Sequence, residues 1–247
     1  MLSGLLNKTR HLLFPERCVA CGKCDTKIDD ALCQSCRNGI EPLPKNLCGV
    51  CGRPLPFEYE IDTGELYECG DCRKKPPPFE RLKFALAYET PIRELMLNFK
   101  FNSARSLAKP LAEFGRPALV PWFCDWPDAI VVPVPLSPYR LFSRGYNPSF
   151  LLARFLCGWS GLKLADGALR KVRATRSQTG LSIKARAKNV KGAFAVFNQK
   201  AIEGRQVILF DDIHTTGATI RECCKTLKTA KPNAIRVATL CRTAEGR

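Results

Sequence analysis

Hydrophobic positions after residue 80 follow two different patterns. Residues 82–88 are apolar at every second position, which predicts a β-strand with one buried face. Strands buried in a parallel sheet are predicted at three short apolar runs, 129–135, 207–210 and 234–240. Helices are predicted at four stretches, 91–101, 104–120, 148–159 and 218–230. This part of the chain is therefore expected to fold as an α/β domain, with a mainly parallel sheet flanked by helices.

The N-terminal segment has a helical pattern of its own. Five leucines among the first 13 residues lie near helical spacing, and Lys8, Arg10 and His11 interrupt them. We expect an amphipathic helix over residues 1–15 that packs on the body of the protein, rather than a signal peptide. No apolar run approaches the length of a membrane span, so a cytoplasmic protein is expected.

The chain divides at a run of three prolines. Residues 74–78 are predicted to form an extended, proline-rich linker. A cysteine-rich module is expected over residues 16–73 before it, and the α/β domain over residues 79–247 after it.

Fourteen cysteines in a cytoplasmic chain argue against a disulfide scaffold. Eight of them form four Cys-x-x-Cys pairs, and two such pairs close one tetrahedral Zn²⁺ site. The predicted ligands of two structural zinc sites are Cys18, Cys21, Cys33, Cys36, Cys48, Cys51, Cys69 and Cys72. Sequential and interleaved pairing both remain open, and Cys24 competes formally for a place in the first pair. A redox role is disfavoured by four pairs in so short a segment.

Charge is spread unevenly along the sequence. The chain has 39 Lys and Arg against 23 Asp and Glu. Residues 1–80 hold 11 of the basic and 12 of the acidic residues, so residues 81–247 hold 28 and 11. Because the excess positive charge belongs to the α/β domain, we expect that domain to attract polyanions, such as pyrophosphate, nucleotides or nucleic acid.

Candidate chemistry is densest at the end of the predicted strand 207–210. Asp211 and Asp212 follow the strand directly, where ligands bind in open α/β sheets. The next residues form a tight turn into a helix, whose free N–H groups and positive dipole end suit a phosphate. The predicted phosphate-binding residues are Thr215, Thr216, Gly217, Ala218 and Thr219. His214 lies at this loop, and the sequence leaves open whether it contacts the ligand.

Two further basic segments are candidates for anion binding. A loop over residues 136–147 follows the predicted strand 129–135 and carries Arg140 and Arg144, whose guanidinium groups suit a diphosphate. The segment 167–191 has eight basic residues and no acid after Gly167; they are Arg170, Lys171, Arg173, Arg176, Lys184, Arg186, Lys188 and Lys191. We expect this segment to be mobile until an anion neutralises it, either as a lid over a polyphosphate or as a surface for a nucleic acid strand. Within it, a short helix over residues 182–189 and a following strand at 192–196 are predicted.

These features in this order resemble the ComF family, and the resemblance covers nearly the whole chain. The matching pieces are the four Cys-x-x-Cys pairs, residues 132–135, 144–147, 178–181 with Arg176, 192–194 with Asn189, and 210–219. Pro148 departs from the family pattern, in which glutamine is more usual. The resemblance implies a double zinc ribbon joined to a domain similar to type I phosphoribosyltransferases. It also implies binding of phosphoribosyl pyrophosphate (PRPP) or a related nucleotide, with Mg²⁺, and a role in handling incoming DNA.

On this reading, Asp211 and Asp212 hold the ribose hydroxyls and Mg²⁺, residues 215–219 hold the 5′-phosphate, and Arg140 and Arg144 face the pyrophosphate. Arg176 and the basic residues around it close over the ligand or carry single-stranded DNA. Proteins of the DNA-uptake machinery are further expected partners. Two other functions remain open: a phosphoribosyltransferase that transfers the phosphoribosyl group of PRPP to an unidentified acceptor and releases pyrophosphate, and a regulator that senses PRPP.

Overall fold

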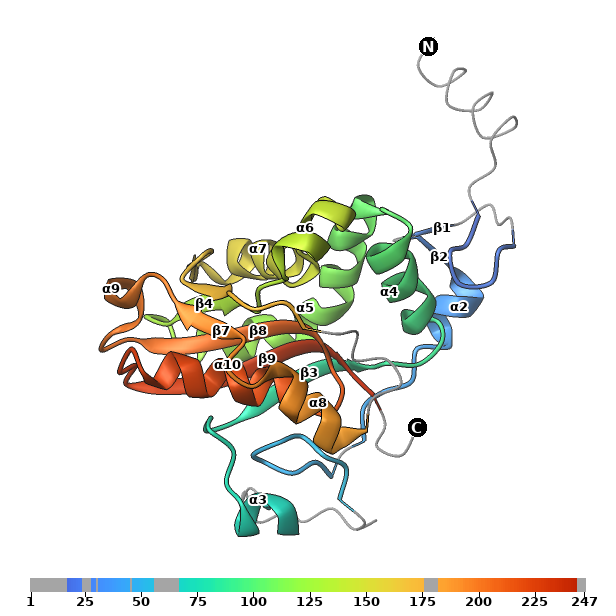
Figure 1. Ribbon diagram of the computed structural model, residues 1–247. Coiled ribbons are helices and arrows are strands. Elements are labelled where there is room, and N and C mark those ends of the chain that lie inside the picture. Colours follow the sequence, from blue (N-terminus) through green and yellow to red (C-terminus); the bar gives the residue numbers. More distant parts are fainter. Residues whose placement is uncertain are drawn as a thin grey trace.

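The computed structural model describes residues 17–23, 28–29, 31–44, 46–55, 67–175 and 182–243. The helix predicted over residues 1–15, Cys24 and Arg176 all lie outside these ranges. Figure 1 shows an α/β body with smaller N-terminal elements to one side and below it.

A five-stranded sheet forms the centre of the body (Figure 1). Its order is β3 (Leu82–Ala87), β9 (Ala234–Arg242), β8 (Gln206–His214), β4 (Ile130–Pro133) and β5 (Lys163–Leu164). Every neighbouring pair is parallel, as expected for the apolar runs of β4, β8 and β9, whereas β5 was not predicted from the sequence. Since parallel strands end at the same edge of a sheet, the residues that follow β8 and β4 lie next to each other.

Helices cover both faces of the sheet. Helices α4 (Ile92–Phe101), α5 (Ala108–Cys124) and α7 (Pro148–Ser160) pack on one face with Ile208 and Phe210 of β8. Helix α10 (Ala218–Lys228) packs on the other face with Val207 and Leu209. The antiparallel pair β6 (Leu169–Lys171) and β7 (Phe194–Val196) belongs to this second core. Strand β8 is thus buried on both faces, which explains its continuous apolar run.

Several short elements differ from the sequence expectations. The predicted loop 136–147 contains a helix, α6 (Pro138–Arg144), which Ser137 caps at its N-terminus and Gly145 ends at φ 77°. Helix α5 follows a 3₁₀ turn, η1 (Arg105–Leu107), and continues to Cys124 through Pro117 and Pro121. Helix α8 (Ile183–Val190) begins after Ser182, as expected, and a short helix α9 (Gln199–Ile202) precedes β8.

The basic segment 167–191 is partly ordered by β6, which the sequence analysis did not predict. Residues 169–171 pair with β7, and Arg173 donates to the carbonyl oxygens of Asn189 and Lys191 at 2.9 and 2.7 Å. Hydrogen bonds to backbone carbonyl groups therefore partly compensate one of the positive charges that were expected to keep this segment mobile.

The cysteine-rich module packs on the α/β body in two places. Its elements are β1 (Ile28–Asp29), β2 (Leu32–Cys33), α2 (Gln34–Asn38) and α3 (Gly70–Lys74). Leu32 joins the core beneath α5, and Arg37 lies over the ring of Phe114 at 5.1 Å. Farther along, the N–H of Leu82 in β3 donates to the carbonyl of Val50 at 2.8 Å. Among the described residues, no helix is long and apolar enough to cross a membrane.

Candidate functional site

A pocket of about 330 Å³ opens at the carboxyl end of β8. Its wall includes the end of β8, the loop that follows and the first turn of α10. Gly217, at φ 72°, forms the N-cap of α10, so that the chain turns sharply from strand to helix. The lining residues are Tyr88, Lys100, Arg140, Arg186, Asp211, Ile213, His214, Thr215, Gly217, Ala218, Thr219 and Ile220.

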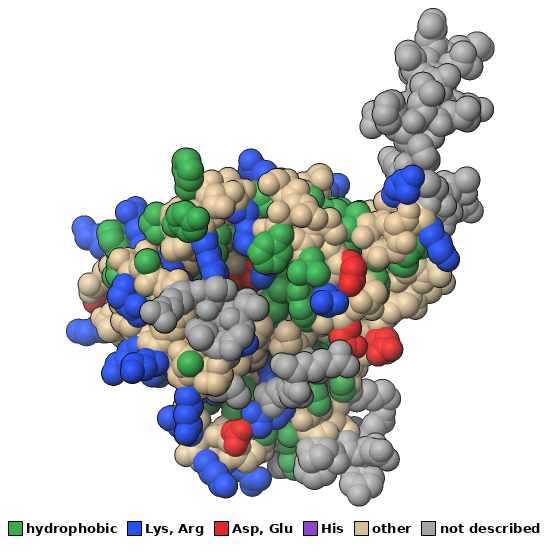
Figure 2. Space-filling model, turned by 45° about the vertical axis from the view of Figure 1, so that its right-hand side comes forward, with side chains coloured by type: hydrophobic (Ala, Val, Ile, Leu, Met, Phe, Trp, Pro, Cys, Tyr) green, Lys and Arg blue, Asp and Glu red, His purple; other side chains and the backbone are tan. Residues whose placement is uncertain are grey.

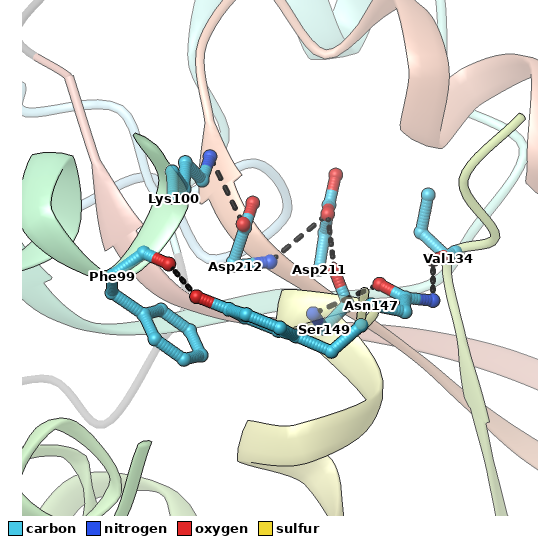
Figure 3. Close-up of polar contacts among 8 residues, drawn as sticks. Phe99, Lys100, Val134, Asn147, Ser149, Asp211 and Asp212 are labelled. Carbon is cyan, nitrogen blue, oxygen red and sulfur yellow. Dashed lines mark hydrogen bonds and ion pairs between the residues drawn. The ribbon is translucent and has the colours of Figure 1, made fainter. Parts of the chain in front are cut away.

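Strand β8 extends to His214 instead of ending at residue 210 as predicted, so both carboxylates lie within the last part of the strand, where they have different neighbours. Asp211 lines the pocket and accepts hydrogen bonds from Ser149 Oγ and from the N–H of Asp212, each at 2.9 Å. Asp212 is buried and forms an ion pair with Lys100 Nζ of α4 at 2.9 Å. Figure 3 shows both carboxylates with these partners. Successive residues of a strand point to opposite sides, which is why the adjacent acids do not share one partner.

Burial and the charge of Asp212 together raise the pKa of Asp211, while Lys100 and Ser149 partly oppose this effect. A carboxyl group in this state gains from a nearby cation, because the cation favours its ionised form. Asp211 is therefore the described acid best placed to respond to a positively charged group that enters the pocket.

The side chain of His214 packs against Gly217 of the loop that follows β8. Its side chain is buried, and its Nδ1 has no hydrogen-bond partner among the described residues. Burial and the charges of Arg242 and Arg221 lower the pKa of His214 to about 3. The imidazole is thus neutral at physiological pH and packs against Gly217 as an uncharged ring.

Four of the five predicted phosphate-binding residues line the pocket; they are Thr215, Gly217, Ala218 and Thr219. Thr216 is not among the lining residues. Its hydroxyl is buried and has no hydrogen-bond partner among the described residues. The loop therefore offers backbone N–H groups and two threonine side chains at the positive end of α10.

The two arginines of α6 face different surroundings. Arg140 lines the pocket. Arg144 lies over the ring of Phe101 at 5.5 Å. Burial lowers the pKa of Arg144, and the charge of Asp212 partly restores it. The structure thus places only Arg140 of this pair on the pocket wall.

The described basic residues that were predicted to act together have different surroundings. Arg186 of α8 lines the pocket, while Lys184, Lys188 and Lys191 are exposed. Lys171 is partly buried and donates to Thr175 Oγ1 at 2.7 Å. Its burial lowers its pKa. Arg170 lies over the ring of Phe197 at 4.5 Å, and Arg173 is bound to carbonyl oxygens as described above.

Sequence analysis missed Lys100, Ser149 and Tyr88 as site residues. Nothing in the sequence links Lys100, near the end of α4, to Asp212. Ser149 lies in the first turn of α7, capped by Asn147, whose Oδ1 accepts from the N–H of Ser149 at 3.1 Å. Lys100 lies near the end of α4 and Ser149 near the start of α7, at the same edge of the sheet as the pocket. Their place in the predicted helices was the sequence signal that could have identified them.

The eight predicted zinc ligands form two clusters of four. Within each, the sulfur atoms all lie within 4.8 Å of one another, in the sequential pairing Cys18/Cys21/Cys33/Cys36 and Cys48/Cys51/Cys69/Cys72. The Sγ atoms of Cys21 and Cys33 are 3.9 Å apart, and those of Cys51 and Cys69 are 3.7 Å apart. Four sulfurs at the usual Zn–S bond length would be separated by about 3.8 Å in a tetrahedron. The N–H of Cys69 also donates to Cys48 Sγ at 3.2 Å. Both clusters fit structural Zn²⁺.

Comparison with known proteins finds two different domain families along the chain. Residues 9–73 match a model of the double zinc ribbon domain, and residues 151–247 match a model of the phosphoribosyl transferase domain. Competence protein F of Haemophilus influenzae is 32% identical over 93% of this chain and 98% of its own length. DNA utilization protein YhgH of Escherichia coli is 32% identical over 86% and 90%. Competence protein ComFC of Bacillus subtilis is 27% identical over 81% and 79%.

Proposed function

We propose that this chain, which belongs to the ComF family of competence proteins, binds PRPP in the pocket after β8 and handles single-stranded DNA when external DNA is taken up or used. Its competence-related role and its phosphoribosyltransferase-like domain follow from the family. The ligand and the form of the DNA are the proposal.

The observation that carries the proposal is the composition of one pocket. A helix N-terminus and its threonine loop lie beside the carboxylate of Asp211, and Lys100, Arg140 and Arg186 line the same pocket. The 5′-phosphate of PRPP needs hydrogen-bond donors, and its two ribose hydroxyls need a hydrogen-bond acceptor. Its diphosphate needs cationic side chains.

In the proposed complex, residues 215–219 hold the 5′-phosphate and Asp211 accepts from the ribose hydroxyls. Arg140 and Arg186 neutralise the diphosphate. Mg²⁺ suits the carboxylate of Asp211 together with phosphate oxygens, because it prefers hard oxygen ligands and usually keeps several waters. The ion would neutralise charge on the diphosphate.

Helix α8 supports the DNA part of the proposal. Arg186 lines the pocket, whereas Lys184 and Lys188 of the same helix are exposed, and Lys191 follows them. Exposed lysines bind phosphates without reading sequence. The relatives named for competence and DNA utilization agree with such a partner.

Calorimetry of PRPP with Mg²⁺, repeated with single-stranded DNA, tests both parts. We expect Arg186→Gln to weaken PRPP binding and Lys188→Gln, its matched control on α8, to weaken only DNA binding. Absence of PRPP binding by the wild-type protein would refute the ligand. Release of pyrophosphate in the presence of a nucleobase would identify a transferase, whereas binding without turnover supports a binding or sensing role.

A further inference from the structure

Helix α6 presents two large aromatic side chains to solvent. Tyr139 is 80% exposed and Phe142 is 91% exposed. They are three positions apart, so they lie on one face of the helix. The helix has no buried residue of its own, and its caps at Ser137 and Gly145 fix its ends. Exposed aromatic side chains of this size on a capped helix indicate a contact surface.

A second cavity of about 460 Å³ lies beside α6. Its apolar wall includes Pro135, Pro138, Leu141 and Phe150, and its volume is within the range of small-molecule sites. Arg140, the residue between Tyr139 and Leu141, lines the pocket after β8 instead. Helix α6 therefore contributes side chains to both cavities.

The surroundings of this cavity are strongly basic. Arg105, Arg170 and Lys171 line it, and Asp166 is the one acidic residue among the described residues that line it. Arg105 and Arg170 lie over the rings of Tyr146 and Phe197 and form no ion pair with a described residue. Figure 2 shows hydrophobic side chains that protrude from a surface rich in Lys and Arg. A ligand that matches this surface carries both flat apolar groups and negative charge.

We propose that α6 and the adjoining cavity form a base-stacking platform for single-stranded nucleic acid. Bases stack on Tyr139 and Phe142, one base enters the cavity beside Leu141, and the phosphates lie along Arg105 and Arg170. This inference rests on the proposed function, to which it adds the place and mode of DNA contact. Unpaired bases fit because their faces are free, and every base has such a face, so the platform does not depend on sequence.

The test is fluorescence anisotropy of a labelled oligothymidine, titrated with the full chain at several salt concentrations. We expect Phe142→Ala and Tyr139→Ala each to weaken binding by about 5- to 100-fold, since stacking of one base on an aromatic residue has this value. The slope of log Kd against log salt should not change, because no charge is removed. Arg170→Gln should lower that slope by about 0.7.

Tyr67→Ala, which removes another exposed tyrosine from the zinc-ribbon module, is the matched control and should bind as the wild type does. The aromatic variants should also keep their affinity for PRPP. If the wild-type protein binds DNA and both aromatic variants bind it equally well, the platform hypothesis is wrong and the proposed function still holds. Loss of binding to lipid vesicles or to another protein, with DNA binding retained, likewise overturns it. No DNA binding by the wild-type protein refutes the proposed DNA partner and the platform together, while PRPP calorimetry still tests the pocket.

Discussion

The Nε2 atom of His214 lies 2.8 Å from the position that a β-carbon would take on Gly217. A side chain at residue 217 would therefore collide with the buried imidazole, in addition to the cost of its positive φ. The contact fixes the shape of the turn that leads into α10. Glycine is therefore the residue that fits at this position of the loop.

Gly217→Ala is accordingly expected to damage both stability and ligand binding. The free energy of unfolding should fall by about 2 kcal/mol or more, of which the left-handed backbone accounts for about 1–2 kcal/mol. PRPP affinity should fall at least about tenfold. The measurements are urea unfolding and calorimetry. Gly161→Ala is the control, because Gly161 has φ 77° but no atom within 4 Å of its added carbon. Equal losses in the two variants would contradict the steric role of His214.

His214 should remain neutral far below the usual pKa of histidine. Its pKa is lowered from 6.5 to about 3 in the folded protein, so the unfolded chain binds the extra proton first. This contribution to stability is complete above pH 6.5 and is lost as the pH falls towards 3, by at most about 1.4 kcal/mol per pH unit. Nuclear magnetic resonance can test it directly, since the chain has two histidines. Titration of His214 with a midpoint near 6.5 would refute the prediction.

The raised pKa of Asp211 acts in the opposite direction over part of the same range. Its protonated form is favoured in the folded state, so its contribution to stability is complete below the unfolded pKa and is lost as the pH rises. The difference in unfolding free energy between the wild type and His214→Gln isolates the histidine. That difference should shrink as the pH falls from 6.5 to 5.

Lys100 should stabilise the fold through Asp212. Their side chains are 18% and 10% exposed, so removal of one leaves a mostly buried charge without its partner. We expect Lys100→Met to lower the free energy of unfolding by about 1–3 kcal/mol. Arg93→Ala is the matched control on α4, because its pair with Glu94 is longer, at 3.5 Å, and the Arg93 side chain is 54% exposed, so its effect should stay below about 0.5 kcal/mol. A double cycle with Asp212→Asn measures the coupling; additive effects would show that the pair is unimportant.

The two cysteine clusters predict two Zn²⁺ ions per chain. Mass spectrometry of the metal content should give two for the wild type and for Cys124→Ser, and one for Cys21→Ser or Cys72→Ser. Loss of the second site should also weaken PRPP binding more than loss of the first. The reason is that Arg242, the neighbour of His214 in the sheet, donates to the carbonyl of Cys51. Equal PRPP affinities in Cys21→Ser and Cys72→Ser would contradict this connection.

Local sequence signals were sufficient for four of the five strands of the sheet and for the turn after β8, but not for the two-residue strand β5. The apolar run of β8 and the threonine–glycine turn specify their structure within a few residues, so both were predictable. The helix α6 was missed, although Ser137-Pro138 and Gly145 are ordinary start and stop signals. It is short and exposes its apolar residues, so it has no buried face to give it a periodic pattern.

Contacts between distant elements were beyond the sequence. The ion pair of Lys100 with Asp212 and the hydrogen bond of Ser149 with Asp211 depend on how α4 and α7 dock on the sheet. The sequence also could not show which two Cys-x-x-Cys pairs share one metal site, because sequential and interleaved sites use the same eight ligands. The different surroundings of Arg140 and Arg144 were also beyond the sequence, because residues four positions apart share one face of a helix and only the docking of α4 beside α6 sets Arg144 over the ring of Phe101.

The second zinc ribbon, which contains the cluster Cys48/Cys51/Cys69/Cys72, also covers part of one edge of the sheet. A long edge strand with unpaired N–H groups can recruit a strand from another molecule, and β3 is such a strand on the side away from β9. There, Val50 takes the N–H of Leu82 and occupies part of that edge. The opposite edge needs no cover, because β5 has two residues and one of them is the exposed Lys163. A metal ion bound by the second cysteine cluster would therefore act against aggregation as well as for folding.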